Sequence, residues 1–131
     1  MFSHVMLGSN DIDESKRFYD ALLGALGAEP GVVDELGRLI YMHGDSVFLL
    51  TQPVDGQPAT HANGATLGFT CESSDQVHSW HAAGLANGGH AAEDPPGVRT
   101  MPVGDLYLAY LRDPAGNKLC ALHRMAYGVT I

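Results

Sequence analysis

The chain has 131 residues, of which 45% are hydrophobic and 17% are charged. This length and composition predict one globular domain with a hydrophobic core. Lys and Arg number 7 against 15 Asp and Glu, a formal net charge of -8 that repels nucleic-acid phosphates and anionic lipid. We therefore expect neither nucleic acid nor a membrane as a partner.

The N-terminus lacks the basic start and apolar stretch of a signal peptide, and no apolar run reaches the roughly 18 residues of a membrane span. A cytoplasmic location is the simplest expectation. The 2 cysteines, Cys71 and Cys120, are too few for a disulfide framework and lack CxxC spacing. We expect both to be reduced thiols.

The first half of the chain predicts a strand, a helix and three short strands. Residues 2–7 form an apolar run that ends at a Gly-Ser-Asn-Asp cluster, and Asn10 or Asp11 can cap the helix that follows. This helix ends at Gly27, and its apolar residues recur at helical spacing, namely Phe18, Tyr19, Leu22, Leu23 and Leu26. Glycine-containing breaks separate three apolar runs, at residues 31–34, 39–43 and 47–51.

The second half repeats this order after residues 52–64, which have no hydrophobic periodicity and predict a linker or a lid. Residues 66–71 predict a strand, and Ser73 or Ser74 caps a helix in which Gln76 completes a capping box. One face of this helix carries Val77, Trp80, Gly84 and Leu85.

The last part of the chain predicts a turn and a hairpin. Residues 90–93 lead into the turn-rich sequence Asp-Pro-Pro-Gly at residues 94–97. Residues 106–112 and 118–123 then flank Asp-Pro-Ala-Gly-Asn, which is a good hairpin turn.

A repeated order of elements changes the expected fold, because each half alone would leave one sheet face bare. We expect an α+β protein that forms one domain over residues 1–131. It contains two βαβββ modules, at residues 1–51 and 65–124, joined by the linker at 52–64. The modules form a cupped mixed sheet around one pocket, with the helices on the outer face.

This pattern resembles the vicinal-oxygen-chelate superfamily of glyoxalases, bleomycin-resistance proteins and extradiol dioxygenases. The resemblance covers nearly the whole chain. It is carried by His4 on the first strand, by the Ser-Lys-Arg-Phe-Tyr sequence at residues 15–19, and most specifically by residues 110–119, where an aromatic strand runs into a DPxGN turn.

In metal-dependent members of the superfamily, one side chain from each of four strands holds the ion. The resemblance places His4, Leu49, Thr66 and Cys120 at these positions, and only His4 is a usual ligand. Leu49 has no donor atom, and one imidazole with one thiolate is half of a tetrahedral zinc shell. We therefore expect no cofactor. A divalent ion such as Zn, Ni, Mg or Mn is disfavoured, even with His61 of the linker as a third ligand.

Strand alternation predicts which side chains line the pocket. A hairpin centred on Ala115 pairs Tyr110 with Cys120 on one face, unless the register slips by a residue. The predicted catalytic residues are His4, Tyr110 and Cys120, and the predicted ligand-binding residues are Met6, Leu49, Thr66 and Gly68. Each could instead be ordinary core filling, and Cys71 on the helix-facing side is expected to be structural.

Three functions remain open from the sequence. The resemblance implies a glyoxalase-like protein, such as a lyase or isomerase for a small carbonyl or thiol adduct, with His4 as base and Tyr110 as proton donor. It implies, alternatively, a bleomycin-resistance-like protein that sequesters a drug or metabolite. The third function is thiol chemistry at Cys120, activated by His4, which requires a lowered thiol pKa. We also expect a homodimer, in which the modules are sometimes exchanged between chains.

Overall fold

The structure, a computed structural model, describes residues 1–125. The first module contains β1 (Val5–Gly8), α1 (Ile12–Gly24), β2 (Val32–Val33), β3 (Leu39–His43) and β4 (Ser46–Thr51). The second module contains β5 (Leu67–Thr70), α2 (Ser74–Ala86), β6 (His90–Met101), β7 (Gly104–Arg112) and β8 (Lys118–Arg124). This order confirms the predicted α+β fold of two βαβββ modules.

Each module forms its own four-stranded sheet, in the order β1-β4-β3-β2 and β5-β8-β7-β6. The first strand of each module runs parallel to the last, and the other neighbours are antiparallel. Within the described residues no ladder joins the two sheets, so the expected cup consists of two separate sheets.

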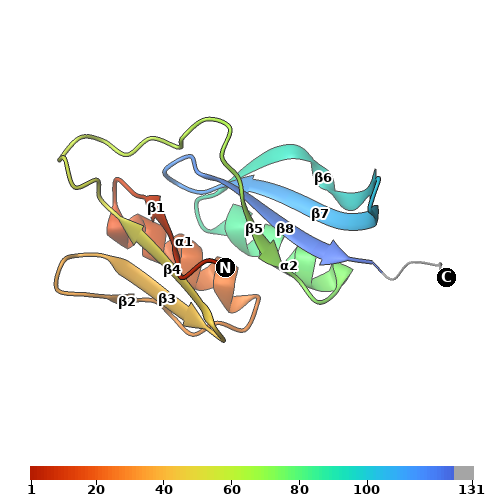
Figure 1. The fold of residues 1–131 in the computed structure, drawn as a ribbon, viewed down its shortest axis with the longest axis horizontal. Coiled ribbons are helices and arrows are strands. Elements are labelled where there is room, and N and C mark those ends of the chain that lie inside the picture. The colour runs from red at the N-terminus through yellow and green to blue at the C-terminus, as the bar shows by residue number, and fades with distance from the viewer. Residues whose placement is uncertain (126–131) are drawn as a thin grey trace.

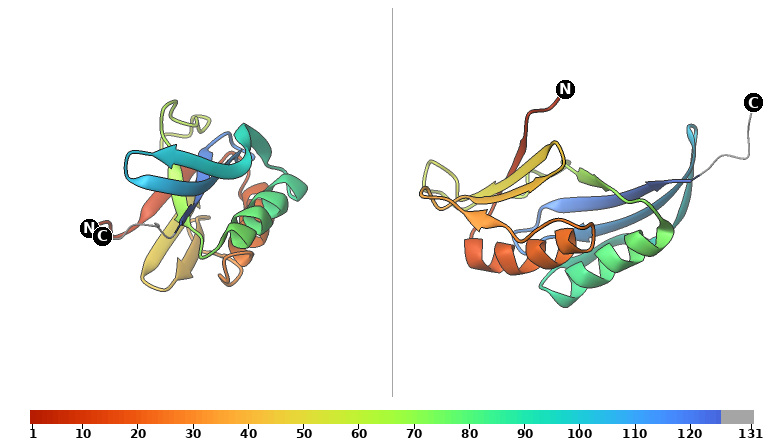
Figure 2. Two further views of the ribbon diagram at one scale, coloured as in Figure 1. Left: turned by 90° about the vertical axis from the view of Figure 1, so that its right-hand side faces the viewer. Right: turned by 90° about the horizontal axis from the view of Figure 1, so that it is seen from below.

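Both helices lie on the same side of the two sheets, as the views in Figures 1 and 2 show. We call the opposite side, which no helix covers, the open face. The core lies between the helices and the sheets, where side chains from both modules pack together. Its fully buried members include Phe18, Leu50, Val77, Trp80 and Leu119. Cys71 lies in the same core, 2% exposed, as the sequence predicts. No helix in the described part of the chain has the length and apolar character to cross a bilayer.

Both ends of α1 follow the sequence closely. Asp11 is the N-cap, and its carboxylate accepts a 3.0 Å hydrogen bond from the backbone N–H of Glu14. The helix ends at Gly24, and Gly27 has a positive φ of 90°. The Gly27 N–H bonds to the Gly24 carbonyl and the Ala28 N–H to the Leu23 carbonyl, both at 3.0 Å, which is a Schellman motif.

The second helix is capped by Ser73, whose hydroxyl accepts a 3.1 Å hydrogen bond from the Gln76 N–H. The Gln76 side chain accepts from the N–H of Glu72, one residue before the expected partner. Val77, Trp80 and Gly84 are buried, but Leu85 is 44% exposed, so its predicted place on the buried face is wrong. At Gly84 an added Cβ would lie 2.3 Å from Leu111 Cδ1 and 3.1 Å from Leu22 Cδ1. The missing side chain therefore permits close approach of α2 to α1 and β7.

Residues 94–97 were predicted to form a turn, and this prediction is wrong, because β6 continues through them. The register between β6 and β7 shifts between Ala92 and Gly97, so the extra residues form a bulge. Glu93 has a positive φ of 55° there, and the Arg99 guanidinium donates to the carbonyls of Asp94 and Pro95. Because β6 is an edge strand, its prolines cost no hydrogen bond to a second neighbour.

Two predicted strand starts also differ from the structure. Strand β1 begins at Val5, so His4 precedes it, and β5 begins at Leu67, so Thr66 precedes it. In both cases the first strand of a module has only one hydrogen-bonded neighbour, β4 or β8, and pairing sets where it begins.

Candidate functional site

The open face carries most of the predicted pocket residues in two groups. In the first module, Met6 on β1 lies directly beside Leu49 on β4. In the second module, Cys120 on β8 has Gly68 of β5 on one side and Tyr110 of β7 on the other. The predicted Tyr110–Cys120 register is therefore confirmed, and these three residues form one row across the sheet.

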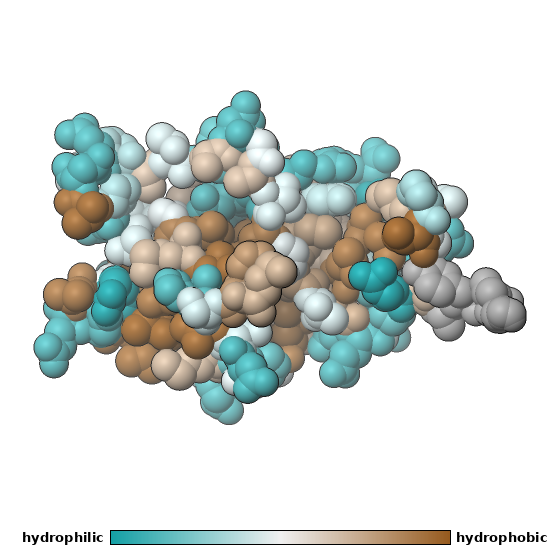
Figure 3. Space-filling view, viewed as in Figure 1, coloured by the Kyte–Doolittle hydropathy of each residue, from teal (hydrophilic) through white to brown (hydrophobic). Residues whose placement is uncertain are grey.

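Apolar side chains gather over both sheets on this face, as the space-filling view shows (Figure 3). Met6 is 40% and Met42 is 69% exposed, whereas Leu106, Leu108 and Cys120 are buried in a small cluster of their own. At Gly68 an added Cβ would meet no atom within 4 Å, so the space beside Cys120 is open. The row of Gly68, Cys120 and Tyr110 thus lies at the edge of an apolar, accessible surface.

Tyr110 and Cys120 change each other's ionisation. Burial raises the pKa of the Cys120 thiol, and the nearby Tyr110 hydroxyl partly offsets this effect. The pKa of Tyr110 is itself raised, first by burial and then by the neighbouring thiol and Glu93. The thiol chemistry considered from the sequence requires a lowered pKa of Cys120, and the structure gives the opposite direction.

Charged groups border this row on one side. The Lys118 ammonium lies 5.0 Å from the centre of the Tyr110 ring, within the range of a cation–π interaction. The same ammonium forms an ion pair with Glu93, whose backbone belongs to the bulge in β6. The bulge thus directs a carboxylate toward Lys118 and Tyr110.

Two of the predicted site residues lie apart from this row. The His4 side chain is exposed, and its Nδ1 is 2.8 Å from the hydroxyl of Ser3. Within residues 1–125 no hydrogen bond joins His4 to Cys120 or Tyr110, so the contact assumed for a His4-activated thiol is not formed. Thr66 is exposed and lines a small pocket beside the linker residue His61.

The four family metal positions do not fit a divalent ion. Leu49 is 8% exposed and carries no donor atom, and Cys120 is a buried thiol whose raised pKa disfavours the thiolate that a metal requires. Among the described residues no three His, Cys, Asp or Glu side chains form a group able to hold a metal. The donor set therefore lacks the ligands for metal-assisted chemistry.

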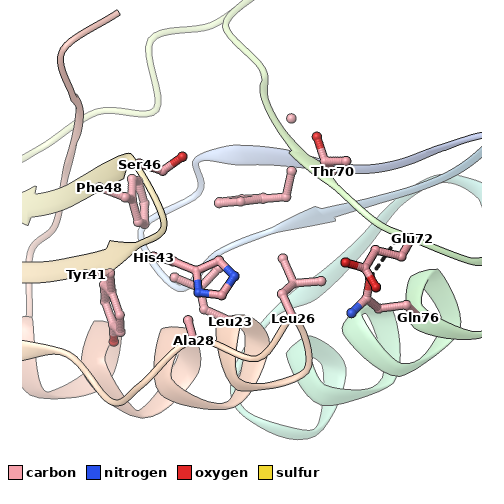
Figure 4. Close-up of a pocket in the computed structure, with 12 residues that line it drawn as sticks. Leu23, Leu26, Ala28, Tyr41, His43, Ser46, Phe48, Thr70, Glu72 and Gln76 are labelled. Carbon is pink, nitrogen blue, oxygen red and sulfur yellow. Dashed lines mark hydrogen bonds between the residues drawn. The ribbon is translucent and has the colours of Figure 1, made fainter.

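A larger pocket, which the sequence reasoning missed, opens between the two modules (Figure 4). We call it the seam pocket. Its volume is about 370 Å³, and α1, β3, β4, β5 and α2 all contribute to its lining. The apolar lining residues include Leu23, Leu26, Phe48 and Phe69, and the polar ones include His43, Ser46, Thr70 and Glu72. Because five elements contribute, no local sequence pattern marks it.

Comparison with known proteins assigns the chain to a class. A family profile described as the Glyoxalase/Bleomycin resistance protein/Dioxygenase superfamily matches residues 1–121. The chain belongs to this superfamily, which confirms the resemblance seen in its sequence. No match was found among curated proteins.

Solved structures agree with this assignment. A glyoxalase/bleomycin resistance protein from Albidiferax ferrireducens T118 is 60% identical, with a TM-score of 0.91 over 95% of this chain and 99% of that chain. A lactoylglutathione lyase from Agrobacterium tumefaciens has a TM-score of 0.66 at 21% identity, over 98% of this chain and 97% of that one. A glyoxalase-related enzyme from Fulvimarina pelagi has a TM-score of 0.71 at 19% identity, over 95% and 88%. The last two show the fold alone.

Proposed function

We propose that this chain is a binding protein that holds a small molecule on its open face and does so without the family's metal. The observation that carries the proposal is the row of Gly68, Cys120 and Tyr110, which combines open space, an apolar floor and one hydroxyl. Ligand pockets typically have this mixture of apolar surface and few polar groups. Met6 and Leu49 on the neighbouring sheet extend the apolar surface.

The preferred ligand has an aromatic or apolar body and a positive charge. A chain with a formal net charge of -8 attracts cations. The aromatic ring of Tyr110 adds a face on which a cation can pack, as Lys118 does. The 60% identical structure carries bleomycin resistance in its name, and bleomycin-like glycopeptides are cationic, so sequestration of such a molecule is the version that we favour.

A lyase or isomerase for small carbonyl or thiol adducts is a weaker proposal. Such chemistry in this superfamily uses a metal to stabilise an enediolate, and Leu49 cannot replace a ligand oxygen. His4, the intended base, lies outside β1 and is exposed. The fold supports the family, and these residues oppose the reaction.

We also propose that two copies associate through the open face. This face has no helix to cover it, and its exposed apolar side chains include Met6 and Met42. Exposed apolar surface of this kind marks interaction sites. Sedimentation velocity of the full chain should show a dimer at micromolar concentration, and a Met42→Glu variant should shift the equilibrium toward the monomer. A wild-type chain that stays monomeric at this concentration would contradict the proposed dimer.

A thermal-shift experiment tests the binding proposal. A cationic glycopeptide at about ten times its dissociation constant should raise the melting temperature by roughly 5 °C. Tyr110→Ala should abolish the shift, and Leu85→Ala, an exposed change on α2, should preserve it. No shift with glycopeptides or aromatic antibiotics contradicts the proposal. Metal-stimulated turnover of hemithioacetals with Zn, Ni, Mg or Mn would support the lyase instead.

A further inference from the structure

The two modules correspond residue by residue around their hairpins. Val5 begins β1 and pairs with Phe48 of β4, and Leu67 begins β5 and pairs with Leu119 of β8. The helix N-caps follow six residues after these strand starts in both modules, at positions 11 and 73. Phe48 and Leu119 are therefore counterparts, and so are the residues two positions before them, Ser46 and Asn117.

The same correspondence relates the residues at the other side of each turn. His43 pairs with Ser46 at the end of the β3–β4 hairpin, and Asp113 bonds to Asn117 at the end of the β7–β8 hairpin. His43 is therefore the counterpart of Asp113. The turn of the first module has two residues, 44–45, and that of the second has three, 114–116.

The longer turn of the second module closes the junction with the first module. The Asn117 amide donates a 2.9 Å hydrogen bond to the carbonyl of Gly8 at the end of β1. The Asp113 carboxylate accepts a 2.6 Å hydrogen bond from the Tyr19 hydroxyl of α1. Asp113 is 0% and Asn117 is 5% exposed, so this side of the junction is filled by protein.

The shorter turn of the first module leaves the equivalent place open. Thr70, at the end of β5, is the counterpart of Gly8, but no hydrogen bond within residues 1–125 connects it to the side chain of Ser46 or His43. The seam pocket occupies this space, and Ser46, His43 and Thr70 line it. The pocket is thus the unfilled counterpart of the Asp113–Asn117 contact.

The chemistry of the pocket selects one kind of ligand. The Glu72 carboxylate forms no hydrogen bond or ion pair with any described residue. Both ends of the Gln76 side chain are already hydrogen-bonded, because its oxygen accepts from the Glu72 N–H and its nitrogen donates to the Ala25 carbonyl. In the view of Figure 4, Glu72 and His43 lie on either side of Leu26. The pocket therefore offers one free carboxylate, two hydroxyls and an apolar floor.

We propose that the seam pocket, which borders the open face at Gly68, is a second binding site for a small primary amine with an apolar or aromatic body. The ammonium group donates to the carboxylate of Glu72, and the body packs on Leu23 and Leu26. A volume of about 370 Å³ is within the range for small-molecule sites. Charge-assisted hydrogen bonds give the amine its advantage over a neutral analogue.

Titration with 2-phenylethylamine tests this site, with 2-phenylethanol and phenylacetate as neutral and anionic analogues of the same shape. We expect a dissociation constant on the order of 1 mM for the amine and at least about tenfold weaker binding of both analogues. In ¹⁵N spectra of the full chain, the amides of Thr70 and Glu72 should shift, and those of Tyr110 and Cys120 should stay in place.

Two variants sharpen the test. Glu72→Gln keeps the hydrogen bond between the backbone N–H of residue 72 and Gln76, and it should weaken binding of the amine about tenfold. Glu29→Gln changes an exposed carboxylate outside the pocket and should leave binding of the amine unchanged. Ala28→Phe should fill the pocket and abolish binding, and its melting temperature shows whether it is folded. Neither variant should alter glycopeptide binding at the open face. The proposal is overturned if the amine does not bind, or if phenylacetate binds as tightly as the amine. It is also overturned if Glu72→Gln and Glu29→Gln weaken the amine equally, or if the amides of Tyr110 and Cys120 shift.

Discussion

The Tyr19 hydroxyl donates a 2.6 Å hydrogen bond to the fully buried carboxylate of Asp113, across 94 residues of sequence. The carboxylate also accepts from the backbone N–H groups of Ala115 and Asn117 and from the Asn117 side-chain amide. Burial, followed by the nearby carboxylate, raises the pKa of Tyr19 well above its ordinary value, so the phenol stays a donor. The DPxGN motif thus acts as a contact between modules.

Removing this contact should destabilise the protein strongly. Asp113→Ala leaves a buried phenol and several amide donors without an acceptor, and we expect a loss of about 3 kcal/mol in the free energy of unfolding. Tyr19→Phe should cost about 2 kcal/mol, since hydrogen bonds to charged groups are the stronger ones. Urea denaturation measures both. In a double-mutant cycle with Asp113→Asn, a coupling energy near zero would contradict a direct interaction, and the exposed Asp105→Asn serves as a control.

Two helical glycines should respond in opposite directions to the same substitution. Gly84→Ala places a Cβ against Leu111 and Leu22 in the core, and overpacking of this kind costs about 1–3 kcal/mol, more than the gain in helix propensity. Gly24→Ala meets nothing within 4 Å and should stabilise the protein by roughly 0.5–1 kcal/mol. Thermal denaturation compares the two variants. A stabilising Gly84→Ala would show that the helices do not approach closely at this residue.

Alkaline pH should destabilise the fold through its buried thiols. Burial raises the pKa of Cys71 from 9.0 to about 11, so below pH 9 the thiol is protonated in both the folded and unfolded states. Above that pH the unfolded state loses its proton first, and stability declines until the folded thiol ionises near pH 11. The free energy of unfolding should fall by about 1 kcal/mol between pH 9 and pH 10 through Cys71. The raised pKa of Cys120 acts in the same direction.

Cys71→Ala should remove its share of this pH dependence, and the Cys71→Ala/Cys120→Ala double variant should leave only the smaller slope that the buried tyrosines add as pH 10 is approached. Urea titrations at several pH values provide the measurement. An unchanged slope in the double variant would assign the alkaline transition to other groups. The buried tyrosines begin to contribute near pH 10, where a phenol ionises in the unfolded state, because burial raises the folded-state pKa of both Tyr19 and Tyr41 above 10.0.

Cys120 should be an unreactive thiol. In a Cys71→Ala background, alkylation by iodoacetamide at neutral pH should be at least about tenfold slower than that of free cysteine, because burial raises the thiol pKa and limits access. Tyr110→Phe should slow the reaction further, since it removes the neighbouring hydroxyl that lowers the pKa of Cys120. A rate equal to that of free cysteine, measured by mass spectrometry, would restore the thiol hypothesis.

Local patterns predicted the elements well, because caps, turns and periodicity depend on neighbouring residues. Asp11 and Ser73 cap the helices as expected, and the hairpin turn centred on Ala115 fixed Tyr110 opposite Cys120. Strand alternation also placed Met6 and Gly68 on the face away from the helices. The exact start of β1, and with it the position of His4, depended on pairing with β4, which the sequence does not encode locally.

The sequence by itself thus determined the two modules, their helix caps and the hairpin register, since each follows from residue types and short-range spacing. Only the tertiary structure decided what the DPxGN motif contacts, how the Asp-Pro-Pro-Gly segment joins a strand, and where a pocket remains. Those outcomes depend on side chains brought together from opposite modules. The two hairpins occupy equivalent places in their modules, but the turn of the second has one residue more. The contact at Asp113 is filled by protein, whereas the equivalent place at His43 is an open pocket.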